Sequence, residues 1–301
     1  MPAFTLTIPT PAGFRFWSAV TGHGWCELPP FECDEAARTL ARVHRLDSGA
    51  VVRVTLRDGG ARLLAEVEGL GAAPTPAQTA EIEQMAARCL GFDHDLSAFY
   101  ALVRDHPRYG WIAGAGAGWL LRSPTVWEDL AKTLLTTNTT WNMTIQMCRR
   151  LAALGDPYPG GGHAFPTPAQ IAALPLAELD AQVRAGYRGA YLHLLADRIA
   201  SGELKVETWR DPHLASAELY RRVKALKGFG DYAAGSMLKL LGHYDRLATD
   251  TECRAAYRDR INGGVPAADD REIAAYYQPF GAWRGLVQWM DVMESCLRPL
   301  A

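Results

Sequence analysis

Hydrophobic and polar residues alternate with a period of two near the start of the chain. Three stretches show this pattern, each with its apolar residues on one strand face: Phe4, Leu6 and Ile8; Val52, Val54 and Leu56; and Leu63, Ala65 and Val67. Such alternation is typical of half-buried β-strands. Asp58-Gly59-Gly60 predicts a hairpin turn between the last two stretches, because glycine adopts the backbone conformation that tight turns need. Residues 33–44 have the pattern of a short amphipathic helix, so a small antiparallel sheet with a helix is predicted.

From about residue 76 the period changes to that of a helix. Ile82, Met85, Cys89 and Leu90 fall on one helical face. Ser123 and Pro124 suit the N-cap and first position of another helix. Further helices are predicted at residues 141–154, 176–201, 214–226, 231–243, 251–260, 270–276 and 282–297. The predicted fold class is therefore α+β, with an N-terminal antiparallel domain over residues 1–95 and a mostly helical domain over residues 96–301.

Charge is divided unevenly between these two parts. The chain has 301 residues, which suits two domains, and its net charge of −2 excludes a general field that attracts polyanions. Residues 1–95 carry 8 basic and 12 acidic side chains, whereas residues 96–301 carry 23 and 21. Any basic surface for a polyanion is therefore expected in the C-terminal two thirds.

Cysteine and histidine spacing gives no sign of a metal centre. The six cysteines are scattered without a C-x-x-C pair, and the eight histidines show no paired ligand spacing. No apolar run is long enough for a membrane span, and no secretory signal opens the chain. We expect a cytoplasmic protein with reduced, mostly buried thiols.

The segment Gly228-Phe229-Gly230 joins two predicted helices. Two glycines one residue apart allow a tight turn and a close approach of the backbone to an outside group. The second helix presents unpaired N–H groups there, which suit a phosphate. Basic residues exceed acidic ones by three between residues 216 and 260. An ordinary corner between helices fits this segment equally well.

A carboxylate follows 20 residues after Gly230, in Thr249-Asp250-Thr251-Glu252. Asp250 or Thr249 could simply cap the next helix, and Thr249 with Glu252 has the spacing of a capping box. The functional interpretation is a carboxylate beside the hairpin, placed to stabilise a cationic sugar or to activate water.

Together these features resemble the helix-hairpin-helix superfamily of DNA glycosylases. Four stretches carry the resemblance in family order: LLRSPTVWEDLAKTLLTTNTTWNMTIQM (120–147), AGYRGAYLHLLADRIASGEL (185–204), LKGFGDYAAGSMLKLLGHYDRLATDTECR (226–254) and FGAWRGLVQWM (280–290). With the N-terminal sheet, the resemblance covers essentially the whole chain. It lies between the 3-methyladenine DNA glycosylase II branch and the 8-oxoguanine DNA glycosylase branch.

The resemblance implies a role in base excision for ten residues. Asp250 is the expected catalytic carboxylate, and Gly228, Phe229 and Gly230 form the hairpin that holds a DNA phosphate. The base pocket is expected to contain Tyr232, Gln288 and Trp283, and the plug and wedge that replace the extruded base are expected to be Asn138, Tyr187 and Arg188. The implied partner is double-stranded DNA containing a damaged base, bound by a monomer that is associated with the nucleoid if the source is bacterial.

Departures from the family pattern bear on the reaction. Tyr232 stands where the 8-oxoguanine branch has its Schiff-base lysine, and Val292 stands where that branch has a pocket phenylalanine. Lys227 replaces the usual hairpin proline, and the four-cysteine iron–sulfur signature is absent, with Cys296 alone near the C-terminus. No cofactor is therefore expected, apart from a monovalent or divalent cation that the hairpin could hold.

Three functions remain open at this level. The first is a monofunctional glycosylase, the second is a glycosylase with AP lyase activity through Lys224 or Lys227, and the third is a non-catalytic module that binds damaged DNA. Tyr232 disfavours the second and Asp250 the third. The damaged base also stays open, because Gln288 favours oxidised purines and Tyr232 favours alkylated, electron-deficient bases.

Overall fold

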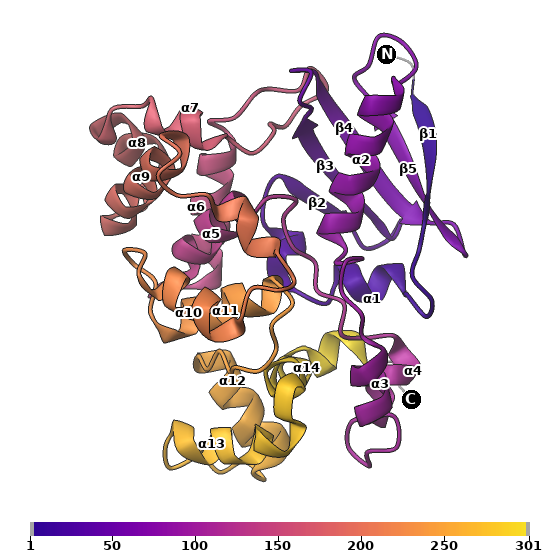
Figure 1. Cartoon of the computed structure of the whole chain (residues 1–301), viewed down its shortest axis with the longest axis vertical. Coiled ribbons are helices and arrows are strands. Elements are labelled where there is room, and N and C mark those ends of the chain that lie inside the picture. Colours follow the sequence, from indigo (N-terminus) through magenta and orange to yellow (C-terminus); the bar gives the residue numbers. More distant parts are fainter. Residues whose placement is uncertain (1–2, 299–301) are drawn as a thin grey trace.

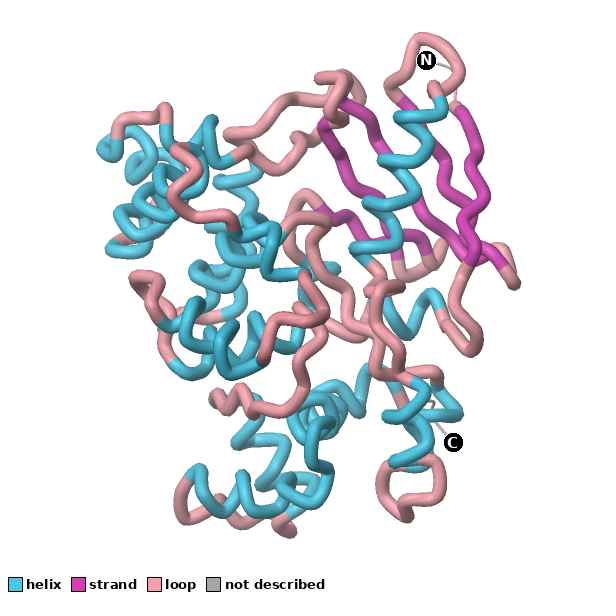
Figure 2. The backbone as a smooth tube through the Cα atoms, viewed as in Figure 1, coloured by secondary structure: helices cyan, strands magenta, loops and turns pink. Residues whose placement is uncertain are grey.

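A five-stranded antiparallel sheet occupies one side of the molecule and helices occupy the other (Figure 2). The computed structural model describes residues 3–298. The strands run in the order β1-β5-β4-β3-β2. Their bounds are β1 (Phe4–Pro9), β2 (Phe31–Asp34), β3 (Thr39–Arg45), β4 (Val51–Asp58) and β5 (Arg62–Glu68). All three predicted strands and the hairpin between β4 and β5 are confirmed.

Helix α2 lies across the sheet, and the remaining long helices follow it along the chain (Figure 1). The first helices are α1 (Phe16–Val20), α2 (Pro76–Cys89), α3 (Ser97–Val103), α4 (Gly110–Ala115), α5 (Val126–Thr136), α6 (Trp141–Ala152) and α7 (Pro168–Ala172). The others are α8 (Leu176–Val183), α9 (Tyr187–Ala200), α10 (Ser216–Lys224), α11 (Asp231–Leu240), α12 (Thr251–Ala256), α13 (Asp270–Tyr277) and α14 (Arg284–Leu297). These elements confirm the α+β class and the helical pattern after residue 76. None of the helices within residues 3–298 has the length and apolar character that a bilayer span needs.

The helix predicted over residues 33–44 is wrong. This stretch contains the end of β2 and most of β3, joined by a turn in which Asp34 Oδ1 accepts the N–H of Ala37 at 2.9 Å. Residues 40–43 are all buried, because β3 is covered on both faces. Burial on both faces removes the period of two from the sequence and leaves an ambiguous pattern.

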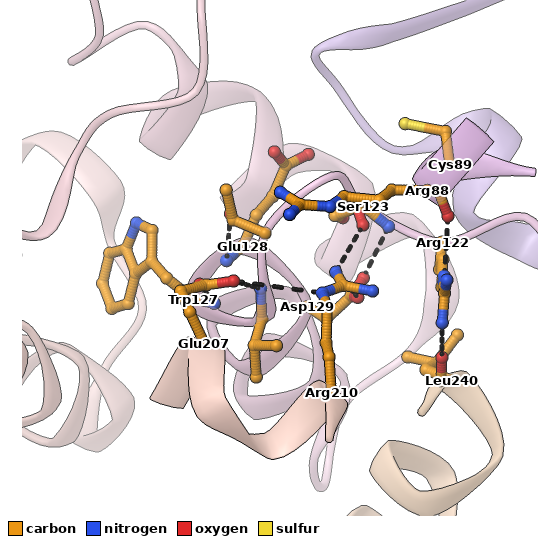
Figure 3. Close-up of polar contacts among 12 residues, drawn as sticks. Arg88, Cys89, Arg122, Ser123, Trp127, Glu128, Asp129, Glu207, Arg210 and Leu240 are labelled. Atoms are coloured by element: carbon orange, nitrogen blue, oxygen red, sulfur yellow. Dashed lines mark hydrogen bonds and ion pairs between the residues drawn. The ribbon is translucent and has the colours of Figure 1, made fainter. Parts of the chain in front are cut away.

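Helix α5 begins two residues later than the Ser123-Pro124 pair predicts. Its N-cap is Thr125, whose hydroxyl accepts the N–H of Glu128. The Glu207 carboxylate accepts the N–H groups of Val126 and Trp127, each at 3.1 Å, and so satisfies the first turn from outside the helix (Figure 3). Ser123 is used otherwise, since its N–H donates to Asp129 and its carbonyl accepts from Arg210.

Arg122, beside this junction, connects helices that are distant in the sequence. Its side chain is 1% exposed, and it donates to the carbonyl of Arg88 at 2.6 Å and to that of Leu240 at 2.9 Å (Figure 3). Arg88 belongs to α2 and Leu240 to α11. A single buried hydrophobic cluster runs through the sheet region and the helices. The domain boundary at residue 95 stays a prediction.

A buried group of charged side chains links β3 to α5. Glu128 lies between Arg42, at 3.0 Å, and Lys132, at 2.8 Å, and all three side chains are at most 4% exposed. Burial alone would raise the pKa of the Glu128 carboxyl, but the two cations outweigh burial and bring the pKa down to about 2.

Glu128→Gln should lower the free energy of unfolding by about 3–5 kcal/mol at neutral pH, because it leaves two buried cations without their acid. Chemical denaturation measures this. The folded pKa lies below the ordinary 4.5, so the stabilisation is present above pH 4.5 and is lost as the pH falls toward 2. The gap between wild type and variant should close over that window. Glu203→Gln, which breaks an exposed pair with Arg198, should change stability by less than about 1 kcal/mol. A difference in unfolding free energy between wild type and Glu128→Gln that does not change with pH would contradict this role of the Glu128 charge.

Candidate nucleic-acid interface and active site

Gly228 makes the corner between α10 and α11 and packs against two other helices. Its φ is +89°, and a Cβ there would lie 2.6 Å from Leu134 Cδ1 and 2.8 Å from Tyr191 Cδ2. Leu134 belongs to α5 and Tyr191 to α9. Glycine is therefore required at this position for close packing and for backbone conformation alike. Phe229, 5% exposed, anchors the turn in the core.

The other side of the hairpin is open. A Cβ at Gly230 would meet nothing within 4 Å. Within residues 3–298, the N–H groups of Gly228 and Gly230 donate to no protein acceptor. Asp231 in the first turn of α11 is paired with Lys224 at 2.5 Å, so its charge is compensated by a neighbouring cation. The hairpin thus offers unpaired N–H groups at a helix N-terminus, as the sequence predicts.

A cavity of about 610 Å³ lies between the α5–α6 loop, α11 and the start of α12. Its lining includes residues from all three elements: Thr136, Asn138, Thr139, Thr140, Trp141, Thr144, Tyr232, Thr249, Asp250, Thr251, Glu252 and Arg254. The structure therefore brings the predicted carboxylate, the predicted plug and Tyr232 to one cavity. Burial and then the nearby charge of Asp250 raise the pKa of the Tyr232 phenol to about 12, so this hydroxyl stays protonated at neutral pH.

Asp250 is the N-cap of α12 and also lines this cavity. Its Oδ1 accepts the N–H of Cys253 at 2.8 Å. Among the residues that the structure describes, Oδ2 has no hydrogen-bond partner. The capping box of Thr249 with Glu252 does not form, because the helix begins one residue later. One oxygen thus holds the carboxylate in place and the other is left for chemistry.

The segment before Asp250 is held between α11 and α14 at two glycines. A Cβ at Gly235 would lie 2.6 Å from the carbonyl oxygen of Leu247, and one at Gly285 would lie 2.1 Å from that of Arg246. The backbone can pass this closely only because both helices lack a side chain there. Neither glycine is among the site residues predicted from the sequence, and a glycine inside a helical pattern is the signal that could have found them.

Gln288 lies behind the carboxylate and does not line the cavity. It is 1% exposed, and its Oε1 accepts the N–H of Ala248 at 3.1 Å while its Nε2 donates to Thr249 Oγ1 at 3.2 Å. The Gln288 side-chain amide thus supports the segment that carries Asp250. Trp283 also lies away from the cavity, stacked on Tyr244 with ring centroids 5.3 Å apart. The base-reading roles of both residues stay predictions.

Asn138 and Tyr187 come together at the surface. Asn138 Nδ2 donates to the Tyr187 hydroxyl at 3.1 Å, and Tyr187 is 50% exposed. Asn138 has a φ of +47°, an uncommon conformation for a residue other than glycine. Arg188 holds the loop in this form, with Nε on the carbonyl of Thr137 and Nη2 on that of Asn138, each at 2.8 Å. Arg188 is 8% exposed and braces this loop, and its predicted role opposite the orphaned base stays a prediction.

Within residues 3–298, no group of three or more His, Cys, Asp or Glu is arranged to hold a metal ion. The six cysteines are free thiols, of which Cys89, Cys148 and Cys253 are buried.

Solved structures share this architecture over nearly the whole chain. The 3-methyladenine DNA glycosylase from Archaeoglobus fulgidus superposes with a TM-score of 0.75 at 17% identity, covering 96% of this chain and 98% of that one. The 8-oxoguanine glycosylase/lyase from Clostridium acetobutylicum gives 0.71 at 18%, with coverage of 96% and 95%. The same enzyme with double-stranded DNA containing cytosine opposite 8-oxoguanine gives 0.69 at 18%, with coverage of 94% and 92%. No protein-family model and no curated protein matches the sequence.

The fold is therefore the one that these 3-methyladenine and 8-oxoguanine DNA glycosylases share, as the resemblance carried by the four sequence motifs predicts. At these identities the likeness establishes the architecture, and the chemistry has to be argued from the site itself.

Gln288→Met should lower the free energy of unfolding by about 1–3 kcal/mol, because the buried N–H of Ala248 loses its acceptor while the volume is nearly conserved. Chemical denaturation of the purified chain measures this. The exposed Gln182 of α8 provides the control, since Gln182→Met should stay within about 0.5 kcal/mol of wild type. Equal stability of wild type and Gln288→Met would show that the amide does not hold the Asp250 segment.

Proposed function

We propose that the chain is a monofunctional DNA glycosylase of base-excision repair. The observation that carries the proposal is the free oxygen of Asp250, which faces a cavity whose rim holds the exposed Asn138–Tyr187 pair. A carboxylate, a place for an extruded nucleotide and side chains to replace it in the duplex are what base excision needs. The glycosylase architecture of the solved neighbours supports the same proposal.

The unpaired N–H groups of Gly228 and Gly230 hold a DNA phosphate and set the position of the duplex. The damaged nucleotide leaves the stack at a cost of a few kcal/mol. Asn138 and Tyr187 enter the gap, since Arg188 already presents their loop at the surface. These steps place the sugar of the extruded nucleotide at Asp250.

Hydrolysis then breaks the bond between C1′ and the base nitrogen. Positive charge develops on the sugar as the base leaves with the bonding electrons, and the Asp250 carboxylate stabilises it. A water oxygen forms the new bond to C1′, and the water's proton passes to Asp250 and on to the departing base. The products are the free base and an abasic site.

The reaction ends at this abasic site because the cavity offers no amine. Tyr232 lines it where a Schiff-base lysine would stand, and a phenol forms no imine. Lys224 is paired with Asp231, and neither Lys224 nor Lys227 lines the cavity. A glycosylase with lyase activity through these two lysines is therefore disfavoured.

Asp250→Asn should slow excision by about 100-fold or more in single-turnover assays on duplexes with damaged bases, because the charge on the sugar loses its counter-charge. Asparagine caps helices as well as aspartate does, so the fold should be kept. In wild-type reactions the strand should break only after hot alkali.

Glu252→Gln is the matched control, since Glu252 is an exposed acid that lines the same cavity two residues away. It should excise at the wild-type rate. Unchanged excision by Asp250→Asn would remove Asp250 from the mechanism. Selective binding of damaged duplex without excision would instead favour the non-catalytic module.

Gly230→Val should weaken binding to undamaged and damaged duplexes by about 10-fold or more, because a side chain in the open space blocks the approach of a phosphate to charge-assisted N–H donors. Fluorescence anisotropy at low salt measures this. Gly114→Val is the control, as a Cβ at that glycine also meets nothing within 4 Å but lies on α4. If both variants bind like wild type, the hairpin is only a corner between helices.

A further inference from the structure

Lys239 is a buried lysine on the face of α11 that leads inward from the cavity. Tyr232, Ser236 and Lys239 are spaced four and three residues apart, so they share one helical face. Exposure falls along this face, from the half-buried Tyr232 at the cavity to 7% for Ser236 and 2% for Lys239. Long side chains on a helix lean toward its N-terminus, so the Lys239 side chain extends toward the cavity end.

Lys239 lacks the kind of partner that other buried cations have. Lys132 has Glu128 at 2.8 Å, Arg42 has the same carboxylate, and Arg188 has backbone carbonyls. Among residues 3–298, Lys239 Nζ forms no ion pair within 4 Å and no hydrogen bond, and its close polar contact is the ring face of Trp289, 4.0 Å away. Burial lowers the pKa of Lys239, and the charges of Cys253 and Asp250, which lie beyond ion-pair distance, only partly offset this. A buried amine with no bonded acid costs stability, which points to a role other than folding.

His23 is the second unpartnered polar group at this place. It is 5% exposed, its Nδ1 has no hydrogen-bond partner, and its ring lies 5.0 Å from that of Trp289. Burial, followed by the charges of Lys239 and Lys132, lowers the pKa of His23, so the ring is neutral at pH 7. The Trp289 indole is fixed by a hydrogen bond from Nε1 to the carbonyl of Gly22 at 2.8 Å.

We propose that Lys239, His23 and Trp289 form the wall that reads the extruded base, with Lys239 Nζ donating to a carbonyl or ring-nitrogen acceptor. This inference rests on the proposed function and adds the class of lesion to it. A donor and a neutral ring nitrogen are groups that hold a flipped base by contacts to its edge, and the indole positions the donor because Lys239 Nζ lies over its ring. Lys239, His23 and Trp289 lie behind the cavity lining, so the base would have to pass Tyr232, which stands at the cavity end of the same helical face.

The position of Lys239 selects neutral bases. An ammonium over the indole occupies the face on which a cationic ring would otherwise stack. A cationic alkylated purine would therefore meet a like charge at this wall, whereas a neutral base with carbonyl oxygens would supply the acceptor that Lys239 lacks. We therefore infer neutral, carbonyl-bearing lesions as the substrate class.

Single-turnover excision by the full chain tests this on duplexes with neutral 8-oxoguanine or hypoxanthine and with cationic 7-methylguanine or 3-methyladenine. 8-Oxoguanine and 7-methylguanine share the guanine ring and its C6 carbonyl, so they compare the charge most directly. Wild type should excise the neutral lesions faster. Lys239→Met should lose about 10- to 100-fold on them, the effect of one hydrogen bond from a charged donor, while its rate on 7-methylguanine stays or rises.

A measurement of thermal stability separates a loss of base reading from misfolding of the variant. Lys239→Met removes an unpaired buried charge, so its melting temperature should rise by about 2 °C or more. Lys239→Gln keeps a hydrogen-bond donor without the charge. It should retain more excision of 8-oxoguanine than Lys239→Met, and it should discriminate less against 7-methylguanine than wild type does.

Four outcomes would overturn the inference. Faster wild-type excision of the cationic lesions, or equal slowing of all lesions in Lys239→Met, would remove Lys239 from base reading and leave the proposed function standing. A borohydride-trapped protein–DNA complex that disappears in Lys239→Met would make the amine a nucleophile at C1′ instead. Excision of no lesion by wild type would overturn the proposed function and this inference together.

Discussion

The buried guanidinium of Arg122 links the sheet side of the molecule to the helical side. It bonds the last turn of α2, beside the sheet, to the last residue of α11, the helix that begins at the hairpin. The chain then enters α5, whose first N–H groups are capped by Glu207 rather than from within the helix. Because α5 carries Leu134 against Gly228 and leads into the loop of Asn138, displacement at this junction would reach the hairpin and the plug together.

Asp250 illustrates how a fold can place a single carboxylate without a network of polar partners. The segment that carries it passes between α11 and α14 at two positions where only glycine leaves room. Gln288 binds the backbone just before it, and Cys253 holds one carboxylate oxygen. The carboxylate keeps one free oxygen because Gln288 and the two glycines act on the backbone, while the Cys253 N–H bonds Oδ1 alone.

Local patterns in the sequence predict the strands, the helices after residue 76 and the hairpin, because periodicity and glycine pairs depend on neighbouring residues. They also place Asp250 and Asn138 at the same cavity through the family resemblance. They fail for residues 33–44, because β3 is buried on one face by α5, through Arg42 and Glu128, and on the other by the α6–α7 loop, through Val43 and Tyr158. The brace of Arg188 reaches residues about 50 positions away, and the isolation of Lys239 is a property of packing, so neither leaves a local signal.

The strained loop at Asn138 has a consequence for association with a duplex. Its backbone already has the uncommon left-handed conformation, and Arg188 and Tyr187 hold it there before any partner arrives. Conformational entropy of about 1–2 kcal/mol per residue is therefore lost during folding and not at the encounter. A preorganised probe of this kind favours rapid sampling of many sites over slow adaptation to each one. If Asn138 is the plug, as proposed, the free protein already has the loop conformation that it would use against the base stack.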